Sequence, residues 1–269
     1  MTLTPTVGPT LHLDVGKALA NLQRLRGWMP STDVWYSIKA NPAVPLLRVL
    51  AKHGAGFHVS SSRELQVTSD LMRSAGAHGL IVCSDPVNSP SLIATAATNG
   101  VRTFGCDSIH EVEKLEAIAG ECEVFVRLDV GAAPGALATA SSGVTLGELP
   151  SLLNRLRRGP VRLRGYTFHV GSNASDIGSW LAAIDCAATA MTVAERVGVR
   201  PEWLNLGGGI PASPAAAERV CQAVMEGLTK ARLIDLHRAV EPGRFLVATA
   251  GSISTHVIGK AVRKGRLHV

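Results

Sequence analysis

The chain has 269 residues, of which 46% are hydrophobic and 18% charged, and this balance excludes an intrinsically disordered protein. The net charge of +6 is spread along the chain, without the basic stripe and interleaved aromatic residues of a nucleic-acid-binding module. No apolar run approaches the length needed to span a bilayer, and the start of the sequence does not resemble a signal peptide. We therefore expect a cytoplasmic protein that binds neither nucleic acid nor membrane.

Short β-branched runs alternate along the chain with longer helical patterns. The runs predicted as strands are 11–13, 34–38, 56–59, 80–83, 102–104, 124–128, 163–169, 203–206 and 238–240. The patterns predicted as helices are 44–52, 62–75, 89–99, 109–119, 146–157, 180–197 and 214–230. Glycine and proline mark most of the junctions. This alternation favours parallel strands connected by helices.

The number of repeats indicates how the sheet is arranged. Roughly eight strand–helix repeats fit a (β/α)8 barrel, and an open doubly wound sheet is the alternative. We expect an N-terminal extension over residues 1–9, the barrel over 10–250 and a basic tail over 251–269. The five cysteines show neither paired nor regular spacing, so we expect reduced, mostly buried thiols and no metal site.

The first chemically informative stretch is Tyr36-Ser37-Ile38-Lys39-Ala40-Asn41-Pro42, in which a lysine closes an apolar strand. Such a lysine can simply extend its amine past the end of the strand into solvent. Alternatively, a lysine held and desolvated in the mouth of a barrel is a nucleophile toward an aldehyde. This stretch alone does not decide between the two interpretations.

Two later stretches also follow predicted strands. Leu206-Gly207-Gly208-Gly209-Ile210-Pro211 places three glycines where the backbone can approach a ligand closely and its N–H groups can bind a phosphate. In Phe168-His169-Val170-Gly171-Ser172 the imidazole could stack on a planar ring and the serine hydroxyl could donate to a phosphate. A flexible turn and a structural core histidine are the competing interpretations.

The stretch Glu241-Pro242-Gly243-Arg244 ends the last predicted strand of the repeat. A carboxylate facing a pyridine nitrogen keeps that nitrogen protonated, which makes the ring an electron sink. An arginine three residues further on could bind an anionic group of the same ligand.

Together, in this order, these motifs resemble the fold-type III decarboxylases that use pyridoxal 5'-phosphate (PLP), a family that includes ornithine, arginine, lysine and diaminopimelate decarboxylases. The matching patterns are Tyr-x-x-Lys-Ala-Asn-Pro, Gly-x-Gly-Phe-x-x-x-Ser, Phe-His-Val-Gly-Ser, Leu-x-x-Gly-Gly-Gly-x-Pro and Glu-Pro-Gly-Arg. The resemblance covers approximately residues 9–260. It implies a (β/α)8 TIM barrel of the alanine racemase-like type, with PLP as its cofactor.

The resemblance implies a role for each matching residue. The predicted catalytic residues are Lys39, which would carry the cofactor as a Schiff base, His169, which would stack on its ring, and Glu241, which would pair with its nitrogen. The residues expected to hold the rest of the cofactor are Ser172, Gly207, Gly208, Gly209, Gly243 and Arg244. His58 and Glu64 are candidates for the substrate pocket.

Three departures from the family pattern lie near this site. His58 stands where the family has an aspartate in Gly-Phe-Asp, and Asn205 stands where an aspartate is common before the glycine loop. The nearest match to the family's Lys-Phe-Gly or Arg-Phe-Gly motif is Ser141-Ser142-Gly143. We therefore expect a cation to be missing from the active site.

A fourth departure is length. Family members continue into a β domain that reaches the active site of the neighbouring subunit, whereas this chain stops at Val269. We expect the first barrel strand at 11–13, the start of that β domain in the basic tail 251–269, and a barrel that lacks most or all of that C-terminal β domain. Exposure of apolar surface would then favour a homodimer, or a hetero-complex with a chain that supplies the missing domain.

The implied activity is PLP-dependent decarboxylation of an amino acid, in amino-acid or polyamine metabolism. The loop Ser172-Asn173-Ala174-Ser175-Asp176 is similar to the ornithine decarboxylase version, which favours an ornithine- or lysine-like basic or diamino acid. A non-catalytic PLP-binding barrel and a regulatory partner of a full-length decarboxylase are the alternatives.

Overall fold

The computed structural model describes residues 8–76, 79–131, 133–134, 142–257 and 259–268. Eight parallel strands form one sheet: β2 (Thr32–Ser37), β3 (Gly56–His58), β4 (Ile81–Val82), β5 (Thr103–Cys106), β6 (Cys122–Arg127), β7 (Val161–Thr167), β8 (Trp203–Asn205) and β9 (His237–Val240). The strand order is β4-β3-β2-β9-β8-β7-β6-β5, so the first and last strands of the repeat lie side by side.

The two outermost strands of this order, β4 and β5, also meet. A parallel bridge joins Cys83 to Phe104. The Cys83 N–H donates to the Thr103 carbonyl at 2.9 Å, and the Gly105 N–H donates to the Cys83 carbonyl at 2.8 Å. The sheet therefore closes on itself, which confirms the predicted (β/α)8 barrel and excludes the open doubly wound sheet.

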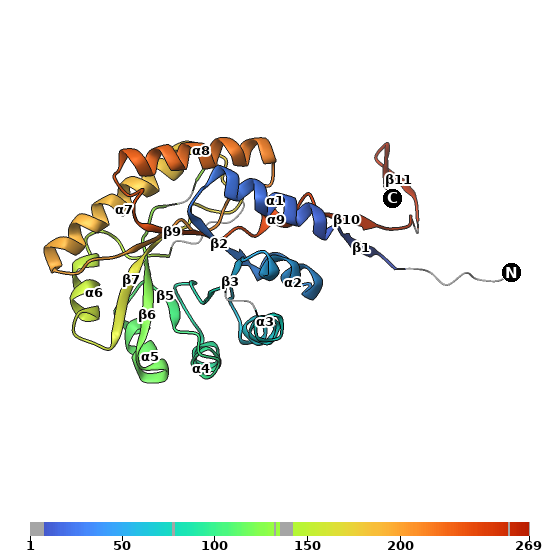
Figure 1. Ribbon diagram of the computed structural model, residues 1–269. Coiled ribbons are helices and arrows are strands. Elements are labelled where there is room, and N and C mark those ends of the chain that lie inside the picture. The colour runs from blue at the N-terminus through green and yellow to red at the C-terminus, as the bar shows by residue number, and fades with distance from the viewer. Residues whose placement is uncertain (1–7, 77–78, 132, 135–141, 258, 269) are drawn as a thin grey trace.

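Helices surround the outside of the sheet (Figure 1). They are α1 (Val15–Trp28), α2 (Val44–Lys52), α3 (Ser62–Ala75), α4 (Pro90–Thr98), α5 (Ile109–Ala119), α6 (Leu149–Leu156), α7 (Ile177–Val197) and α8 (Pro214–Lys230). Several begin at a side chain that caps the first turn, as where Ser108 accepts a hydrogen bond from the Glu111 N–H. All seven helices predicted from the sequence form.

Helix α1 was not predicted, although a signal was present. Ala18, Leu22 and Leu25 are buried at helical spacing, and Asp14 caps the first turn by accepting from the Lys17 N–H at 3.0 Å. The short 3-10 helix η1 (Ile38–Ala40) and helix α9 (Arg244–Val247) were also not predicted, because a single turn leaves too little periodicity in the sequence.

The strand predicted at 11–13 forms as β1 (Thr10–Leu13), but it is not a barrel strand. It pairs antiparallel with β10 (Gly251–Ser254), outside the eight-stranded sheet. The expectation that the barrel begins there was wrong, because most side chains of β1 are exposed whereas those of a barrel strand are covered. The barrel begins instead at β2.

The segment expected to be a basic tail also contains strands. β11 (Ala261–Arg263) and β12 (Arg266–His268) form an antiparallel hairpin that extends, like β1 and β10, to one side of the barrel (Figure 1). Large apolar side chains are exposed on these elements, including Leu11, Ile253, Val262 and Leu267.

Helix α7 is long and apolar enough to cross a membrane by length and composition, contrary to the expectation from the sequence. Within the barrel it has another explanation. Trp180, Ala183, Ile184 and Ala187 are buried along one face at helical spacing. This face packs on the barrel core, so the composition of α7 is that of a helix covering a sheet.

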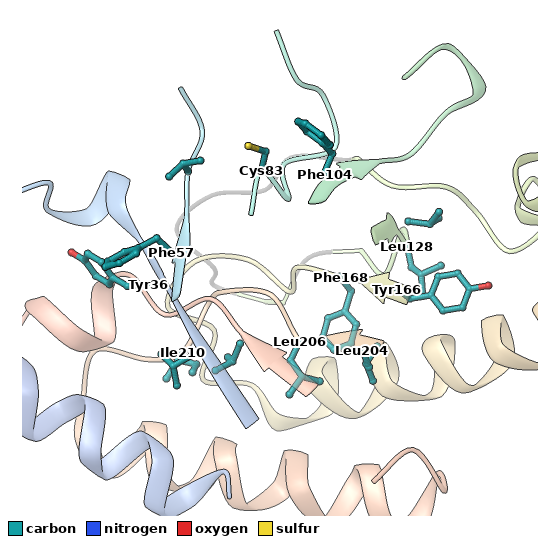
Figure 2. Packing of buried hydrophobic residues seen from close by; sticks show 14 of the residues in the cluster. Tyr36, Phe57, Cys83, Phe104, Leu128, Tyr166, Phe168, Leu204, Leu206 and Ile210 are labelled. Atoms are coloured by element: carbon teal, nitrogen blue, oxygen red, sulfur yellow. The ribbon is translucent and has the colours of Figure 1, made fainter. Parts of the chain in front are cut away.

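The main core lies between the sheet and the helices. Figure 2 shows buried side chains of neighbouring strands, such as Tyr36 beside Phe57, which are partners in the register of β2 and β3. Four of the five free cysteines are buried and Cys186 is half-buried, in agreement with the predicted mostly buried thiols. Burial raises the pKa of Cys221 to about 12.

A second, smaller core fills the inside of the barrel. It consists of Trp35, Val82, Phe125 and Ala239, with Trp203 packed against them. The ring of Trp35 lies 5.7 Å from that of Phe125 and 5.8 Å from that of Trp203, measured between centroids. Gly165 makes room for this packing, because a Cβ there would lie 2.0 Å from the Trp203 carbonyl oxygen.

Candidate active site

A layer of polar side chains lies directly above this apolar interior. Side chains alternate along a strand, so residues two positions apart point to the same side of the sheet. Two residues beyond the inward-facing Trp35, Val82, Phe125, Trp203 and Ala239 stand Ser37, Ser84, Arg127, Asn205 and Glu241, in that order. The barrel interior therefore changes from apolar to polar at the carboxyl ends of its strands, where barrel active sites are built.

Four of these polar residues, Ser37, Ser84, Arg127 and Glu241, line a cavity of about 640 Å³. Among the residues around it are all of the predicted cofactor residues and one substrate-pocket candidate: Lys39, His58, His169, Ser172, Gly207, Gly208, Gly209, Glu241, Gly243 and Arg244. The fold thus brings together residues that lie as far as 205 positions apart in the sequence, from Lys39 to Arg244. Their individual roles remain predictions.

The carboxylate of Glu241 lines the cavity and is held from several sides. Its Oε1 accepts hydrogen bonds from the hydroxyl of Ser84 and, at 2.6 Å, from the side-chain amide of Asn205. Its Oε2 lies 3.5 Å from Nδ1 of His58. Asn205 is itself fixed, because its Oδ1 accepts from the Gly207 N–H at 2.9 Å. This network fixes the orientation of a buried acceptor that faces the cavity.

The glycine loop after β8 follows a path that side chains would block. Gly207 and Gly209 have φ angles of +65° and +106°, and a Cβ on them would lie 2.0 Å from the Phe168 carbonyl oxygen and 2.3 Å from that of Gly171. Within the described part of the chain, the N–H groups of Gly208 and Gly209 donate no hydrogen bond. The loop therefore offers backbone donors to an anionic ligand.

His169 lies at the end of β7, beside this loop. A Cβ on Gly208 would lie 3.4 Å from Cε1 of the imidazole. Burial, helped by the charge of Arg127, lowers the pKa of His169 to about 4, so the ring is neutral at physiological pH. A neutral planar ring in this place is suited to stacking on a flat ligand.

Lys39 lies in η1, just after β2. Its Nζ is 3.7 Å from Oδ1 of Asp85, and its side chain is 57% exposed. Of the two interpretations of Lys39, this exposure does not agree with a desolvated amine in the chain alone, because η1 carries the lysine out to the rim of the cavity. The amine is accessible to a ligand and has a carboxylate as its nearest charged neighbour.

Glu64 is the predicted site residue that the structure does not bring to the cavity. Its Oε2 accepts from the Ser60 N–H at 2.8 Å, and its own N–H donates to the hydroxyl of Ser61 at 3.3 Å. Ser61 is the N-cap of α3, so Glu64 belongs to a reciprocal cap of this helix. The spacing of serine and glutamate was itself the signal for this structural role.

The cavity is also lined by residues that no sequence motif predicted, among them Ser84, Asp85 and Arg127. Arg127 places a cation at the site, contrary to the expectation that one would be absent; Ser141, in the motif on which that expectation depended, lies outside the described residues. Burial lowers the pKa of Arg127 despite opposing carboxylates, first among them Asp85. Its position at the carboxyl end of a strand could have identified it.

The comparisons with known proteins agree with this site. Residues 15–248 match the family described as "Pyridoxal-dependent decarboxylase, pyridoxal binding domain". The chain is 30% identical over 261 residues to the lysine/ornithine decarboxylase of Selenomonas ruminantium, with 95% of this chain and 65% of that protein covered.

Solved structures show the same fold. The arginine decarboxylase of Paramecium bursaria Chlorella virus superposes with a TM-score of 0.89 at 22% identity, over 98% of this chain and 71% of that one. The structure of SrLDC with PLP and cadaverine gives a TM-score of 0.84 at 27% identity, over 98% and 67%.

The match leaves part of each relative uncovered. The chain spans less than two thirds of the curated relatives, 65% of the Selenomonas ruminantium enzyme and 53% of the ornithine decarboxylase of Candida albicans. The family match nevertheless covers most of this chain, including the strands that carry the polar layer. The chain therefore belongs to the pyridoxal-dependent decarboxylases, whose pyridoxal-binding barrel it forms, and its cofactor is PLP.

Proposed function

We propose that the chain is the catalytic barrel of a decarboxylase for a basic or diamino acid, ornithine- or lysine-like, with PLP held as a Schiff base on Lys39. One observation carries the proposal: a single cavity gathers an accessible lysine amine, a fixed buried carboxylate and a glycine-lined cradle with an arginine beside it. A phosphorylated pyridine aldehyde needs each of these groups.

The residues fit PLP as a set. Lys39 would supply the amine that holds the cofactor, Glu241 would pair with its ring nitrogen, and the imidazole of His169 would stack on its ring. The N–H groups of Gly208 and Gly209, together with Arg244, would hold the phosphate, and Ser172 and Gly243 line the same cavity. When bound, PLP supplies the electron sink for loss of CO2 from an amino acid.

The chain's own groups have separate tasks in this reaction. Glu241, fixed by Ser84 and Asn205, would keep a proton on the ring nitrogen of the cofactor. His169 is neutral and can pack on a flat ring without adding charge. Lys39 would hold the cofactor through its side-chain amine. These tasks are orientation and charge placement, which is what a protein contributes to cofactor chemistry.

The proposed substrate class depends on the relatives and on one loop. The Selenomonas ruminantium relative is named a lysine/ornithine decarboxylase, and the loop at Ser172 and Asn173 resembles the ornithine decarboxylase form. In this cavity the carboxylate of Asp85, 30% exposed, is an acidic group that a cationic substrate can approach.

The barrel, expected over residues 10–250 and beginning at β2 in the structure, is proposed to work with a second structural unit. We propose that β1, β10 and the β11–β12 hairpin belong to that unit, since they leave apolar side chains such as Ile253 and Val262 exposed. A homodimer, or a hetero-complex with a chain that supplies a β domain, would cover them. The proposed compartment is the cytoplasm.

The test begins with the absorbance spectrum of the protein with PLP, before and after borohydride reduction, beside Lys39→Ala. A Schiff-base band that reduction fixes on Lys39 is expected, followed by CO2 release from ornithine or lysine. A fixed band without CO2 release from any amino acid, with or without a full-length homologue, would favour the non-catalytic barrel. Absence of a lysine-dependent band would favour a regulatory partner.

Light scattering tests the proposed assembly. A dimer or larger complex is expected at micromolar protein concentration, and a soluble monomer would contradict it.

A further inference from the structure

His58 is a buried side chain placed between two carboxylates. Only 3% of it is exposed, at the end of β3. Its Nδ1 lies 3.1 Å from the hydroxyl of Ser37 and 3.5 Å from Oε2 of Glu241, and its Nε2 lies 3.6 Å from Oδ1 of Asp85. Within the described residues Nε2 has no hydrogen-bond partner.

This environment favours the charged imidazolium. Burial by itself would lower the pKa of His58, but the negative charge of Glu241, and after it the nearby carboxylate of Asp85, raise the pKa overall. Lys39 opposes them, and Arg127, at the end of β6, acts on the same two carboxylates. When Nε2 is protonated, this buried atom is a hydrogen-bond donor that faces the carboxylate of Asp85.

The carboxylate of Asp85 lies next to the amine of Lys39. It follows β4, the neighbour of β3 in the sheet, and its Oδ1 is 3.7 Å from Nζ of Lys39. His58 and Lys39 hold its pKa well below the usual range against the effect of burial, so Asp85 is ionised. The family pattern puts an acid at position 58, and this chain has its acid on the next strand instead.

We propose that Asp85 is the acid that positions the Lys39 amine and that protonated His58 links Asp85 to Glu241. Asp85 and His58 thus form an acid–imidazole pair. The proposal rests on the proposed function of the same cavity. Asp85 and His58 are positioning residues: one acts through Lys39 and the other through the two carboxylates. Without the imidazolium, Asp85 and Glu241 would share a buried site with no cation between them.

The pair predicts that its two members are interchangeable. His58→Asp would place three carboxylates together, and Asp85→His would leave Lys39 without its acid. Each single variant is expected to weaken PLP binding by about tenfold or more. The double variant His58→Asp/Asp85→His exchanges the two members, so an acid and an imidazole are both present again, and its PLP affinity is expected within about threefold of that of the original protein.

The measurement is a PLP titration of the four proteins by absorbance, with borohydride trapping to count the lysine-bound cofactor. Asp235→His makes the same chemical change as Asp85→His at the opposite mouth of the barrel and should leave the affinity for PLP unchanged. Losses that simply add in the double variant would overturn the proposal. Thermal midpoints of the four apoproteins give the same cycle if a single variant folds poorly.

A second readout does not need the cofactor. An NMR titration of the apoprotein, with His58 assigned by its loss in His58→Asn, should give a midpoint above the ordinary value of about 6.5. Asp85→Asn should lower that midpoint by about one pH unit. A midpoint below 6.5, or one that Asp85→Asn leaves in place, would contradict the pair. Failure of PLP to attach to Lys39 would contradict the proposed function. The titration of the apoprotein would still test the pair of Asp85 and His58, because it does not depend on PLP.

Discussion

The barrel interior has a lower half of apolar side chains and an upper half of polar side chains at the carboxyl ends of the strands. The same strands build both halves, but the lower half contributes packing and the upper half forms the cofactor site. Trp35, Phe125 and Trp203 fill the lower half with aromatic rings that touch edge to face or at a tilt. Two residues further along β2 and β9, Ser37 and Glu241 begin a layer of hydrogen-bonded polar groups. A step of two residues thus separates packing from chemistry. Mutations in the lower half should change stability, and mutations in the upper half should change the cofactor site.

The largest effect is expected in the lower half. Trp203→Ala removes a ring that packs on Trp35 and Phe125, and we expect a loss of about 3–5 kcal/mol in the free energy of unfolding. Urea unfolding measures it. Val262→Ala, at an exposed position of the hairpin, should change the same quantity by less than about 0.5 kcal/mol. A small loss in Trp203→Ala would mean that the interior collapses around the gap.

The second prediction concerns the upper half. Asn205→Asp replaces the amide that donates to Glu241 with a second carboxylate, 2.6 Å from the first in the present geometry. Since two adjacent carboxylates disfavour each other's ionised forms, we expect PLP affinity to fall about tenfold or more, as measured by absorbance titration. Asn154→Asp on α6 is the matched control. Unchanged affinity in Asn205→Asp would show that the charge of Glu241 is not what the cofactor needs.

The third prediction uses the neutral state of His169. Its folded-state pKa of about 4 lies below the ordinary value, so from about pH 6.5 down to pH 4 the unfolded chain binds a proton that the folded chain does not. The free energy of unfolding should therefore decrease as the pH is lowered from about 6.5 to 4, and His169 should account for about 1–3 kcal/mol of this loss. His169→Phe keeps a flat ring without titrating. Urea unfolding of the apoprotein should show a shallower acid slope for this variant, and equal slopes would contradict a neutral, buried His169.

The smallest effect is expected outside the cavity. Glu64→Ala removes half of the reciprocal cap of α3 and should cost about 1 kcal/mol of stability, close to the cost of Ser61→Ala, the other half. PLP affinity should stay the same in both variants. A loss of PLP or substrate binding in Glu64→Ala but not in Ser61→Ala would contradict this prediction and support a role for Glu64 in the substrate pocket.

The ranges of most elements were predictable because their patterns are local. The ranges predicted for α2, α3, α5 and α8 coincide with the observed helices, each bounded by capping residues, glycine or proline and by a continuous apolar periodicity. β1 was predicted as a strand for the same reason. Its partner was not predictable, because pairing with β10 joins residues more than 230 positions apart and leaves no local signal.

The candidate site divides in the same way. Lys39, His169 and Glu241 stand in stretches whose residue types and order already indicate PLP chemistry. Ser84, Asp85 and Arg127 stand in no such motif, and only closure of the sheet brings them to the cavity. Glu64 shows the converse, since its position matches the family pattern while its hydrogen bonds belong to a helix cap.

The sequence by itself determined the alternation of strands and helices, because that depends on local periodicity. It also determined the barrel and the cofactor, because the number of repeats and the order of the short motifs resemble those of a known family. Tertiary structure alone decided which charges surround His58. The reason is geometric: its neighbours Ser37, Asp85 and Glu241 come from three other strand ends, and their distances depend on how eight strands close into one ring.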